Sequence, residues 1–182
     1  MTDKTSLRAE ARARRAAAHG SVDPQPALDA LAAEIAKTTG PVSFYWPIRT
    51  EIDPRPLMET LSGSRQLCLP VTHGRDAPLT FRAWQPDADM DVDGFGVAIP
   101  ARDVPVTPEI LVVPMLAFDL HLHRLGYGAG HYDRTLAGLR PSGPAFAIGF
   151  AYEAQRTSTL PAEPTDQALD LIVTEETVHR RS

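Results

Sequence analysis

One ten-residue run, Arg124–Asp133, has the composition of a phosphate-binding loop. Its sequence is RLGYGAGHYD, in which Gly126, Gly128 and Gly130 alternate with other residues between an arginine and an aspartate. Glycine permits positive φ and lets backbone N–H groups approach an anion, and a helix that follows adds unpaired N–H donors. Arg124 could offset phosphate charge, and Asp133 could hold a divalent cation through its carboxylate oxygens.

The glycine spacing by itself also fits a tight turn from strand to helix in which Asp133 is a capping residue. The run is neither the dinucleotide-binding fingerprint nor a Walker A loop. The preceding segment Ile110–Val113 is short, apolar and rich in β-branched residues, which is typical of a buried parallel strand. Ligands of open α/β sheets bind beyond the carboxyl ends of such strands, so the order of strand, glycine loop and helix favours a binding loop.

Five segments of the chain carry a resemblance to one protein family. Pro114–Asp119 with Arg124–Asp133 resembles the 5-formyltetrahydrofolate cyclo-ligases, also called 5,10-methenyltetrahydrofolate synthetases. Lys4–Arg8 is similar to the Lys-x-x-Leu-Arg opening of this family, and Tyr45–Asp53 to its Tyr-x-Pro-x-x-x-Glu-(Val/Ile)-Asp element. Thr165–Thr174 is similar to its Asp-x-x-x-Asp element, which three apolar residues and a threonine follow. The resemblance covers nearly the whole chain.

The resemblance implies an ATP- and Mg²⁺-dependent ligase. In that reaction ATP phosphorylates the formyl oxygen of 5-formyltetrahydrofolate, the anilino nitrogen attacks the formyl carbon, and 5,10-methenyltetrahydrofolate, ADP and phosphate are released. Because phosphoryl transfer depends mainly on positioning and charge neutralisation, the protein needs no nucleophilic side chain. Cys68, between two leucines of an expected strand, is accordingly interpreted as a buried core thiol.

The resemblance, together with the residue chemistry, also implies which residues contact each ligand. The residues expected to bind ATP are Lys4, Arg8, Arg124, Gly126, Gly128, Gly130 and Tyr132. Those expected to bind the folate are Trp46, Glu51, Tyr127 and His131, and those expected to hold the metal are Asp133 and Asp166. Alternatives stay open for several of these residues. Glu51 could be an acid at a helix N-terminus, and Trp46 could fill the sheet surface. Asp133 and Asp166 could each be a cap or turn residue instead of a metal ligand.

Three positions depart from the family pattern. His131 stands in place of a tyrosine, Ala129 in place of a glycine, and Ile99 in place of an acidic residue. Either the missing acid is peripheral or the activity is shifted.

Two rival functions are considered: a protein of this type that binds folate or a nucleotide without closing the ring, or an enzyme that handles ribose phosphates or CoA. The second rival needs its own catalytic acid or nucleophile, for which Asp119 is the one strong candidate.

Composition sets further limits. A chain of 182 residues fits a single domain, here expected over residues 1–182, and its lone cysteine excludes an internal disulfide, which suits a cytoplasmic location. No apolar stretch approaches the ~20 residues of a membrane span, and the net charge of −5 without a basic aromatic patch disfavours nucleic acid. We expect a monomer. His121 and His123 lack a third zinc ligand and are expected on a solvated loop.

The N-terminal segment is basic although the chain as a whole is acidic. Lys4, Arg8, Arg12 and Arg15 recur at steps of four, four and three, which places them on one face of a helix. We expect Lys4 and Arg8 to contact phosphate, and Arg12, Arg14 and Arg15 to be solvated.

Alternating apolar segments predict an α/β fold: a three-layer open sheet, Rossmann-like, with mostly parallel central strands and helices on both faces. Helices are expected over 4–18, 27–38, 54–62 and 131–139, and strands over 42–46, 66–70, 79–84, 110–113, 145–150 and 170–174. The stretch 72–108 is expected to be an irregular connection with a hairpin that contributes to the pocket wall. Its acidic residues, Asp87 to Asp93, are expected only to be solvated, and Asp170 to be structural.

Overall fold

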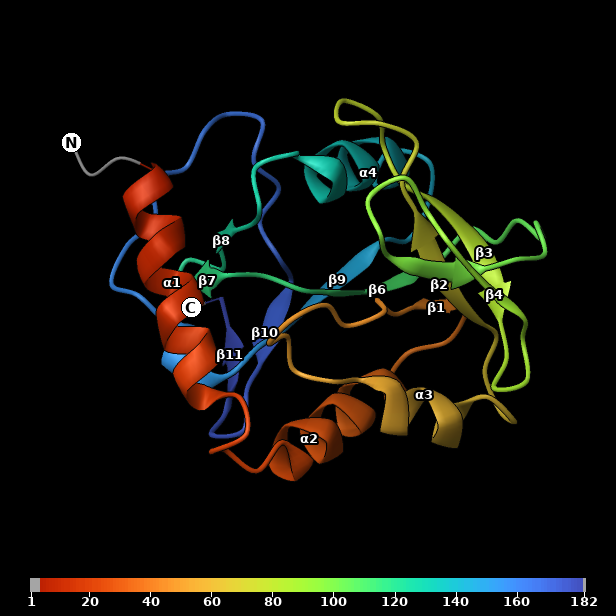
Figure 1. Cartoon of the computed structure of the whole chain (residues 1–182), viewed down its shortest axis with the longest axis horizontal. Coiled ribbons are helices and arrows are strands. Elements are labelled where there is room, and N and C mark those ends of the chain that lie inside the picture. The colour runs from red at the N-terminus through yellow and green to blue at the C-terminus, as the bar shows by residue number, and fades with distance from the viewer. Residues whose placement is uncertain (1–3, 182) are drawn as a thin grey trace.

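A computed structural model describes residues 4–181 of the chain. Its central sheet has seven strands in the order β11-β10-β9-β6-β1-β2-β3. The strands from β10 to β2 run parallel, and the edge strands β3 and β11 are antiparallel to their neighbours (Figure 1). The bounds are β1 Val42–Ser43, β2 Leu67–Val71, β3 Thr80–Trp84, β6 Ile110–Val113, β9 Phe146–Phe150, β10 Leu171–Val173 and β11 Val178–Arg180.

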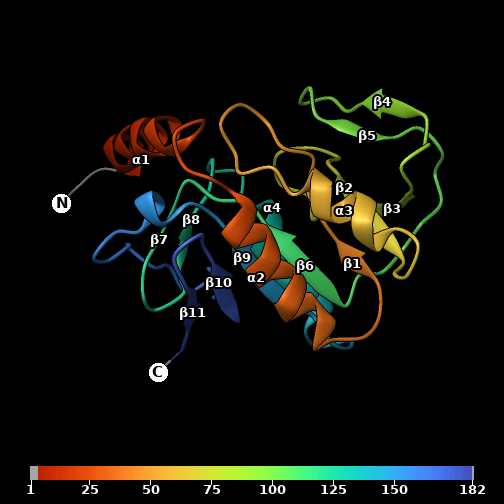
Figure 2. The ribbon, with the colours of Figure 1, turned by 90° about the horizontal axis from the view of Figure 1, so that it is seen from below.

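Helices cover both faces of this sheet. Helices α2 (Gln25–Ala36) and α3 (Arg55–Leu61) lie on one face, α4 (His131–Leu139) lies on the other, and α1 (Lys4–Ala18) lies at one end (Figure 2). Alternation along β6 explains the layers, because Ile110 and Val112 join the apolar cluster of α2 and α3 while Leu111 and Val113 join that of α4. The predicted three-layer α/β architecture is confirmed.

Two small antiparallel pairs complete the fold. The first joins β4 (Met90–Val92) to β5 (Ala98–Pro100), and the second joins β7 (Ala117–Phe118) to β8 (Arg124–Leu125), directly before the glycine loop. A short 3₁₀ turn, η1 (Glu153–Gln155), packs against α1. The predicted hairpin within 72–108 is therefore present, whereas the sequence patterns missed the pair β7–β8 and the last strand, β11.

Most predicted elements lie within a residue or two of the observed ones, but the strand expected over 42–46 is wrong in length. Strand β1 ends at Ser43, although Phe44 still donates its N–H to Cys68 O at 3.1 Å. The chain then leaves the sheet, and Tyr45 donates its hydroxyl to Ile52 O in the loop that leads to α3. The apolar character of residues 44 and 45 therefore reflects burial in a loop.

Several structural roles predicted from the sequence are confirmed. Cys68 is fully buried in β2, and burial raises the pKa of its thiol to about 12. Asp170 accepts the N–H of Ala147 at 2.7 Å and lies 3.3 Å from Arg140, so it joins β9 to the end of α4.

None of the helices within residues 4–181 is both long and apolar enough to span a membrane.

The acidic residue Asp93 does more than the predicted solvation. Its Oδ1 accepts the N–H groups of Phe95 and Val97, at 2.9 and 3.0 Å, and its Oδ2 accepts the hydroxyl of Thr72. Burial raises the pKa of Asp93, but together these bonds favour the charged carboxylate and hold its pKa below the usual range of an aspartate. Asp93 therefore ties the β4–β5 turn to the end of β2.

Candidate active site

A pocket of about 760 Å³ lies beyond the carboxyl ends of β1, β2 and β6. Its walls come from α1, the loop after β1, the β4–β5 turn, the glycine loop and the segment 160–167. All the residues predicted to contact a ligand line it: Lys4, Arg8, Trp46, Glu51, Arg124, Gly126, Tyr127, Gly128, Gly130, His131, Tyr132, Asp133 and Asp166. The topology thus brings together segments that are distant in the sequence.

The glycine loop turns into α4 with two residues in the left-handed region. Gly128 has φ 107°, and Gly130, the N-cap of α4, has φ 68°. The loop also lies close to α1, because Arg8 Nε donates to Gly126 O at 3.0 Å. A Cβ at Gly128 would lie 3.2 Å from the Arg8 guanidinium. The backbone conformation therefore favours glycine at position 128, and a Cβ there would also crowd the Arg8 guanidinium.

We expect Gly128→Ala to reduce the rate of the reaction proposed below by about tenfold or more. Strained backbone at a non-glycine residue costs about 1–3 kcal/mol, and relief of that strain would move the loop and Arg8. The measurement is steady-state kinetics with thermal unfolding. Gly138→Ala is the matched control, since Gly138 lies within α4 with open space around its Cβ position, and it should keep full activity. Equal kinetics in the two variants would contradict this account of the loop.

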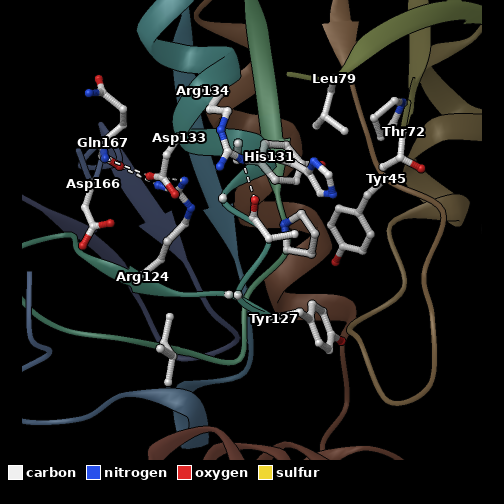
Figure 3. Close-up of a pocket in the computed structure, with 18 of the residues that line it drawn as sticks. Tyr45, Thr72, Leu79, Arg124, Tyr127, His131, Asp133, Arg134, Asp166 and Gln167 are labelled. Carbon is white, nitrogen blue, oxygen red and sulfur yellow. Dashed lines mark hydrogen bonds and ion pairs between the residues drawn. The ribbon is translucent and has the colours of Figure 1, made fainter. Parts of the chain in front are cut away.

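One side of the pocket is charged. The Arg124 side chain is only 6% exposed, and it donates to Asp133 Oδ1 at 2.7 Å and to the backbone oxygen of Gln167. Asp166 accepts the N–H of Glu163, whose carboxylate pairs with Lys4. Arg124, Asp133, Asp166 and Gln167 lie together at this side in Figure 3. The arrangement offers cations for phosphate and carboxylates for a metal on the same wall.

The carboxylates of this wall suit a metal that arrives with a nucleotide. Among residues 4–181 no group of three or more His, Cys, Asp or Glu side chains is arranged to hold a metal ion. Asp133 Oδ2 and Asp166 Oδ1 accept no hydrogen bond from those residues, so each remains available as a ligand. Mg²⁺ bound to ATP takes one or two carboxylates and completes its coordination with phosphate oxygens and water. The donor set fits that mode of binding.

The other side of the pocket is aromatic. The Nδ1 atom of His131 lies 3.0 Å from Ala77 O, and the ring centroids of His131 and Phe95 lie 5.8 Å apart in an edge-to-face arrangement. The Arg55 guanidinium lies over the ring of Trp46, 5.2 Å from the ring centroid, in a cation–π contact. Figure 3 shows Tyr45 and His131 across the pocket from Arg124. Tyr132 has a buried hydroxyl without a partner among the described residues, and burial raises its pKa.

Glu51 lines the pocket next to Tyr127 and is only 4% exposed. Its Oε2 accepts the N–H of Ile48 at 2.9 Å, and its Oε1 accepts the Tyr127 hydroxyl at 3.0 Å. Burial raises its pKa, while the Ile48 N–H and the Arg15 guanidinium act in the opposite direction. Glu51 precedes α3 by several residues, so the alternative of an acid at the helix N-terminus is wrong.

The prediction that Arg15 is solvated is wrong, since its exposed fraction is 1%. Arg14 is also partly buried, whereas Arg12 is exposed as predicted. The spacing correctly places Arg15 on one helix with Lys4 and Arg8, but the C-terminal half of α1 packs against η1. No pattern within α1 indicates which segment covers it.

A model of the 5-formyltetrahydrofolate cyclo-ligase family matches residues 1–175 of the chain. This chain belongs to that family. The cyclo-ligase of Escherichia coli K12 is 33% identical over 140 residues, which cover 73% of this chain and 76% of that one. The Haemophilus influenzae cyclo-ligase is 33% identical over 157 residues, 82% of each chain. The family resemblance that the motifs predict is thus confirmed.

Solved structures with the same fold agree. An NMR structure of the Aquifex aeolicus 5,10-methenyltetrahydrofolate synthetase superposes with a TM-score of 0.77 at 28% identity, over 97% of this chain and 92% of that one. The Mycoplasma pneumoniae synthetase superposes with a TM-score of 0.76 over 96% and 99% of the two chains; at 23% identity it supports the fold alone.

Within this cyclo-ligase fold, two residues weighed in the sequence have roles outside the pocket. Asp119 is fully buried, and its carboxylate accepts backbone N–H groups from His121, His123 and Leu160, so it joins the β7–β8 turn to segment 160. Ile99 is 6% exposed in β5 and is not among the lining residues. Backbone N–H groups therefore occupy the carboxylate of Asp119, the candidate acid of the rival enzyme, and Ile99 lies outside the pocket lining.

The structure also brings residues into the pocket that were not among the predicted ligand contacts. They include Thr72, Leu79, Asp93, Phe95 and Val97 of the region 72–108, which was expected to contribute to the wall, and Arg49 after β1. Phe95 is half exposed at the pocket, and Arg49 has φ 55° although it is not glycine. The pair Phe95–Gly96, close to the departure from the family pattern at Ile99, was the sequence signal that could have identified Phe95.

Proposed function

We propose that this chain converts 5-formyltetrahydrofolate to 5,10-methenyltetrahydrofolate, with ATP as the co-substrate that yields ADP and phosphate. The observation that carries the proposal is one pocket with a cationic, glycine-lined side and an aromatic side that holds a buried carboxylate. A nucleotide phosphate and a folate ring require these two chemistries next to each other. Family membership points to the same reaction.

The reaction needs two bond exchanges. In the first, the formyl oxygen forms a bond to the terminal phosphorus of ATP and the bond to ADP breaks, while the lone pair of the formamide nitrogen makes an iminium. In the second, the anilino nitrogen bonds to the formyl carbon, the carbon–oxygen bond breaks, phosphate leaves and the attacking nitrogen loses its proton. The product holds one carbon between the two nitrogens.

The charged side would bind and neutralise the polyphosphate. Lys4, Arg8 and Arg124 supply the cations, and N–H groups of the glycine loop and of the first turn of α4 supply hydrogen bonds. Mg²⁺, when bound, would neutralise phosphate charge, with Asp133 and Asp166 as its protein ligands. The partners that now occupy Lys4 and Arg124, Glu163 and Asp133, would give way in part to phosphate oxygens.

The aromatic side would bind the folate. Glu51 presents a carboxylate that can accept hydrogen bonds from the amino group and ring N–H of a pterin, and Trp46 and His131 offer faces for stacking. Tyr127 touches both sides, because it belongs to the glycine loop and donates to Glu51. We further propose that residues 1–182 act as a single domain, as a monomer and in the cytoplasm.

The test is to mix the purified chain with 5-formyltetrahydrofolate, ATP and Mg²⁺ and to follow the absorbance band of the methenyl product. We expect a rise that requires ATP and that EDTA abolishes and excess Mg²⁺ restores. Release of ADP should match product formation one to one. A folded protein that binds folate or ATP saturably but forms neither product would contradict the proposal and support the rival binding function.

A further inference from the structure

We infer that Arg15 is a positioning residue for the folate side of the pocket, which keeps the Glu51 carboxylate charged and fixes the Glu51 and Tyr127 side chains toward the ligand. The inference rests on the proposed function, since it assigns Glu51 to the folate. Arg15 itself does not line the pocket, so it acts through these two neighbours.

The contacts of Arg15 use most of its guanidinium. Nη2 donates to the Tyr127 hydroxyl at 2.8 Å, and Nη1 lies 3.6 Å from Glu51 Oε1. Nε donates to Thr50 Oγ1 at 3.1 Å, and Nη1 also donates to Met115 O at 3.4 Å. The Tyr127 hydroxyl in turn donates to Glu51 Oε1. Arg15, Tyr127 and Glu51 thus form a closed set in which each side chain limits the orientation of the other two. The planar guanidinium suits several directed bonds.

The main charged and titratable groups around Glu51, among the described residues, come from several elements. The cations are Arg15 and Arg49, the neutral phenols are Tyr127, Tyr45 and Tyr132, and the remaining donor is the Ile48 N–H. Arg49 is exposed, so solvent screens its charge. Arg15 is therefore the principal buried cation that compensates this buried carboxylate.

Loss of Arg15 should raise the pKa of Glu51. Burial raises the pKa of Glu51, and Arg15 lowers it. Without the guanidinium, the carboxyl would stay protonated to a higher pH, and a protonated carboxyl accepts hydrogen bonds from a pterin less strongly than a carboxylate does. Loss of Arg15 should therefore weaken folate binding most at acidic pH and less as the pH rises.

The position of Arg15 on α1 limits the effect to one ligand. The same helix contacts the glycine loop at two points: Arg8 at Gly126 O and, two turns later, Arg15 at the Tyr127 hydroxyl. Lys4 and Arg8, in the N-terminal half of α1, lie at the charged side of the pocket, where we place the phosphates. Arg15, in the C-terminal half of the helix, lies near Glu51. An Arg15 variant should leave the phosphate end in place as long as α1 remains folded.

The experiment compares Arg15→Leu and Arg15→Lys with Arg14→Leu. This matched control removes the neighbouring, partly buried guanidinium, which is not among the described residues that line the pocket. The readouts are KM and kcat for 5-formyltetrahydrofolate and for ATP from pH 5.5 to 8.5, together with equilibrium binding of 5-formyltetrahydrofolate without ATP. For Arg15→Leu at neutral pH we expect the folate KM and Kd to rise about tenfold or more, and the ATP KM to change by no more than about twofold.

The pH profile separates positioning from simple structural support. The acidic limb of kcat/KM for the folate should move to higher pH in Arg15→Leu, move less in Arg15→Lys, which retains a charge, and stay unchanged in Arg14→Leu. Equal losses for both ligands with an unmoved acidic limb would overturn the inference. If Arg15→Leu does not fold, the limb of Arg15→Lys decides by the same criterion.

The binding arm keeps the two proposals distinguishable. If the wild type binds 5-formyltetrahydrofolate but forms no product, the proposed function fails, while the pH dependence of Kd in the variants still tests Arg15. If the wild type is active and a folded Arg15→Leu variant binds the folate as the wild type does across the whole pH range, the proposed function stands and the assignment of Arg15 fails.

Discussion

Arg124→Ala should reduce kcat of the proposed cyclisation by about 10²- to 10³-fold, the range typical for removal of one preorganised donor from a site of developing charge. The guanidinium is 6% exposed and oriented by Asp133 and the backbone of Gln167, so no other side chain can easily take its place. The measurement is the rate of product formation at saturating folate and ATP. Arg124→Lys should recover only part of the rate, because an ammonium lacks the planar fork.

Arg82→Ala is the matched control for this prediction. Arg82 also pairs with an aspartate, Asp103, at 3.2 Å and donates to a backbone oxygen, that of Pro100, but it does not line the pocket. It should lose a little stability and keep its turnover. A rate for Arg124→Ala within about threefold of the control would show that Arg124 only holds the glycine loop to the backbone of Gln167.

Glu51→Gln should raise the folate KM about tenfold or more and also lower the free energy of unfolding by about 3 kcal/mol. The affinity falls because an amide accepts hydrogen bonds from a pterin less strongly than a carboxylate. The stability falls because Arg15 would remain buried without its counter-charge, and the loss of one partner of a buried ion pair costs about 3–5 kcal/mol. Steady-state kinetics and urea unfolding measure the two effects.

Glu59→Gln in α3 provides the comparison, since Glu59 is exposed and outside the pocket lining. Both its stability and its kinetics should stay close to those of the wild type. A normal folate KM in Glu51→Gln would remove Glu51 from the folate site, and an unchanged free energy of unfolding would mean that Arg15 is compensated by other groups.

Local patterns in the sequence predicted the elements well where one backbone geometry explains the residues. The apolar run Ile110–Val113 alternates between the two faces of a parallel sheet, and a central strand needs no other information. The glycines of Arg124–Asp133 were predicted to allow positive φ, and Gly128 and Gly130 have it. Gly126 is different, because its φ is not positive and a Cβ there would meet nothing within 4 Å.

The sequence was less informative where a residue depends on a distant partner. Asp93 belongs to an acidic stretch that looks merely solvated, yet its carboxylate joins the β4–β5 turn to Thr72. Asp119 was the one acid considered for a rival chemistry, and the N–H groups of its own turn and of Leu160 occupy its carboxylate. Both carboxylates find partners through folding, and a list of acidic residues does not contain that information.

The sequence by itself determined the α/β layers, the glycine loop at the start of a helix, and the family to which the chain belongs. These follow from short-range periodicity and from motifs, which act through local backbone geometry. The tertiary structure alone decided that Arg15 is buried against Glu51 and Tyr127, although its spacing matches that of the pocket-lining Lys4 and Arg8. Helical periodicity specifies which residues share a face of α1, but burial depends on which distant segments pack against that face.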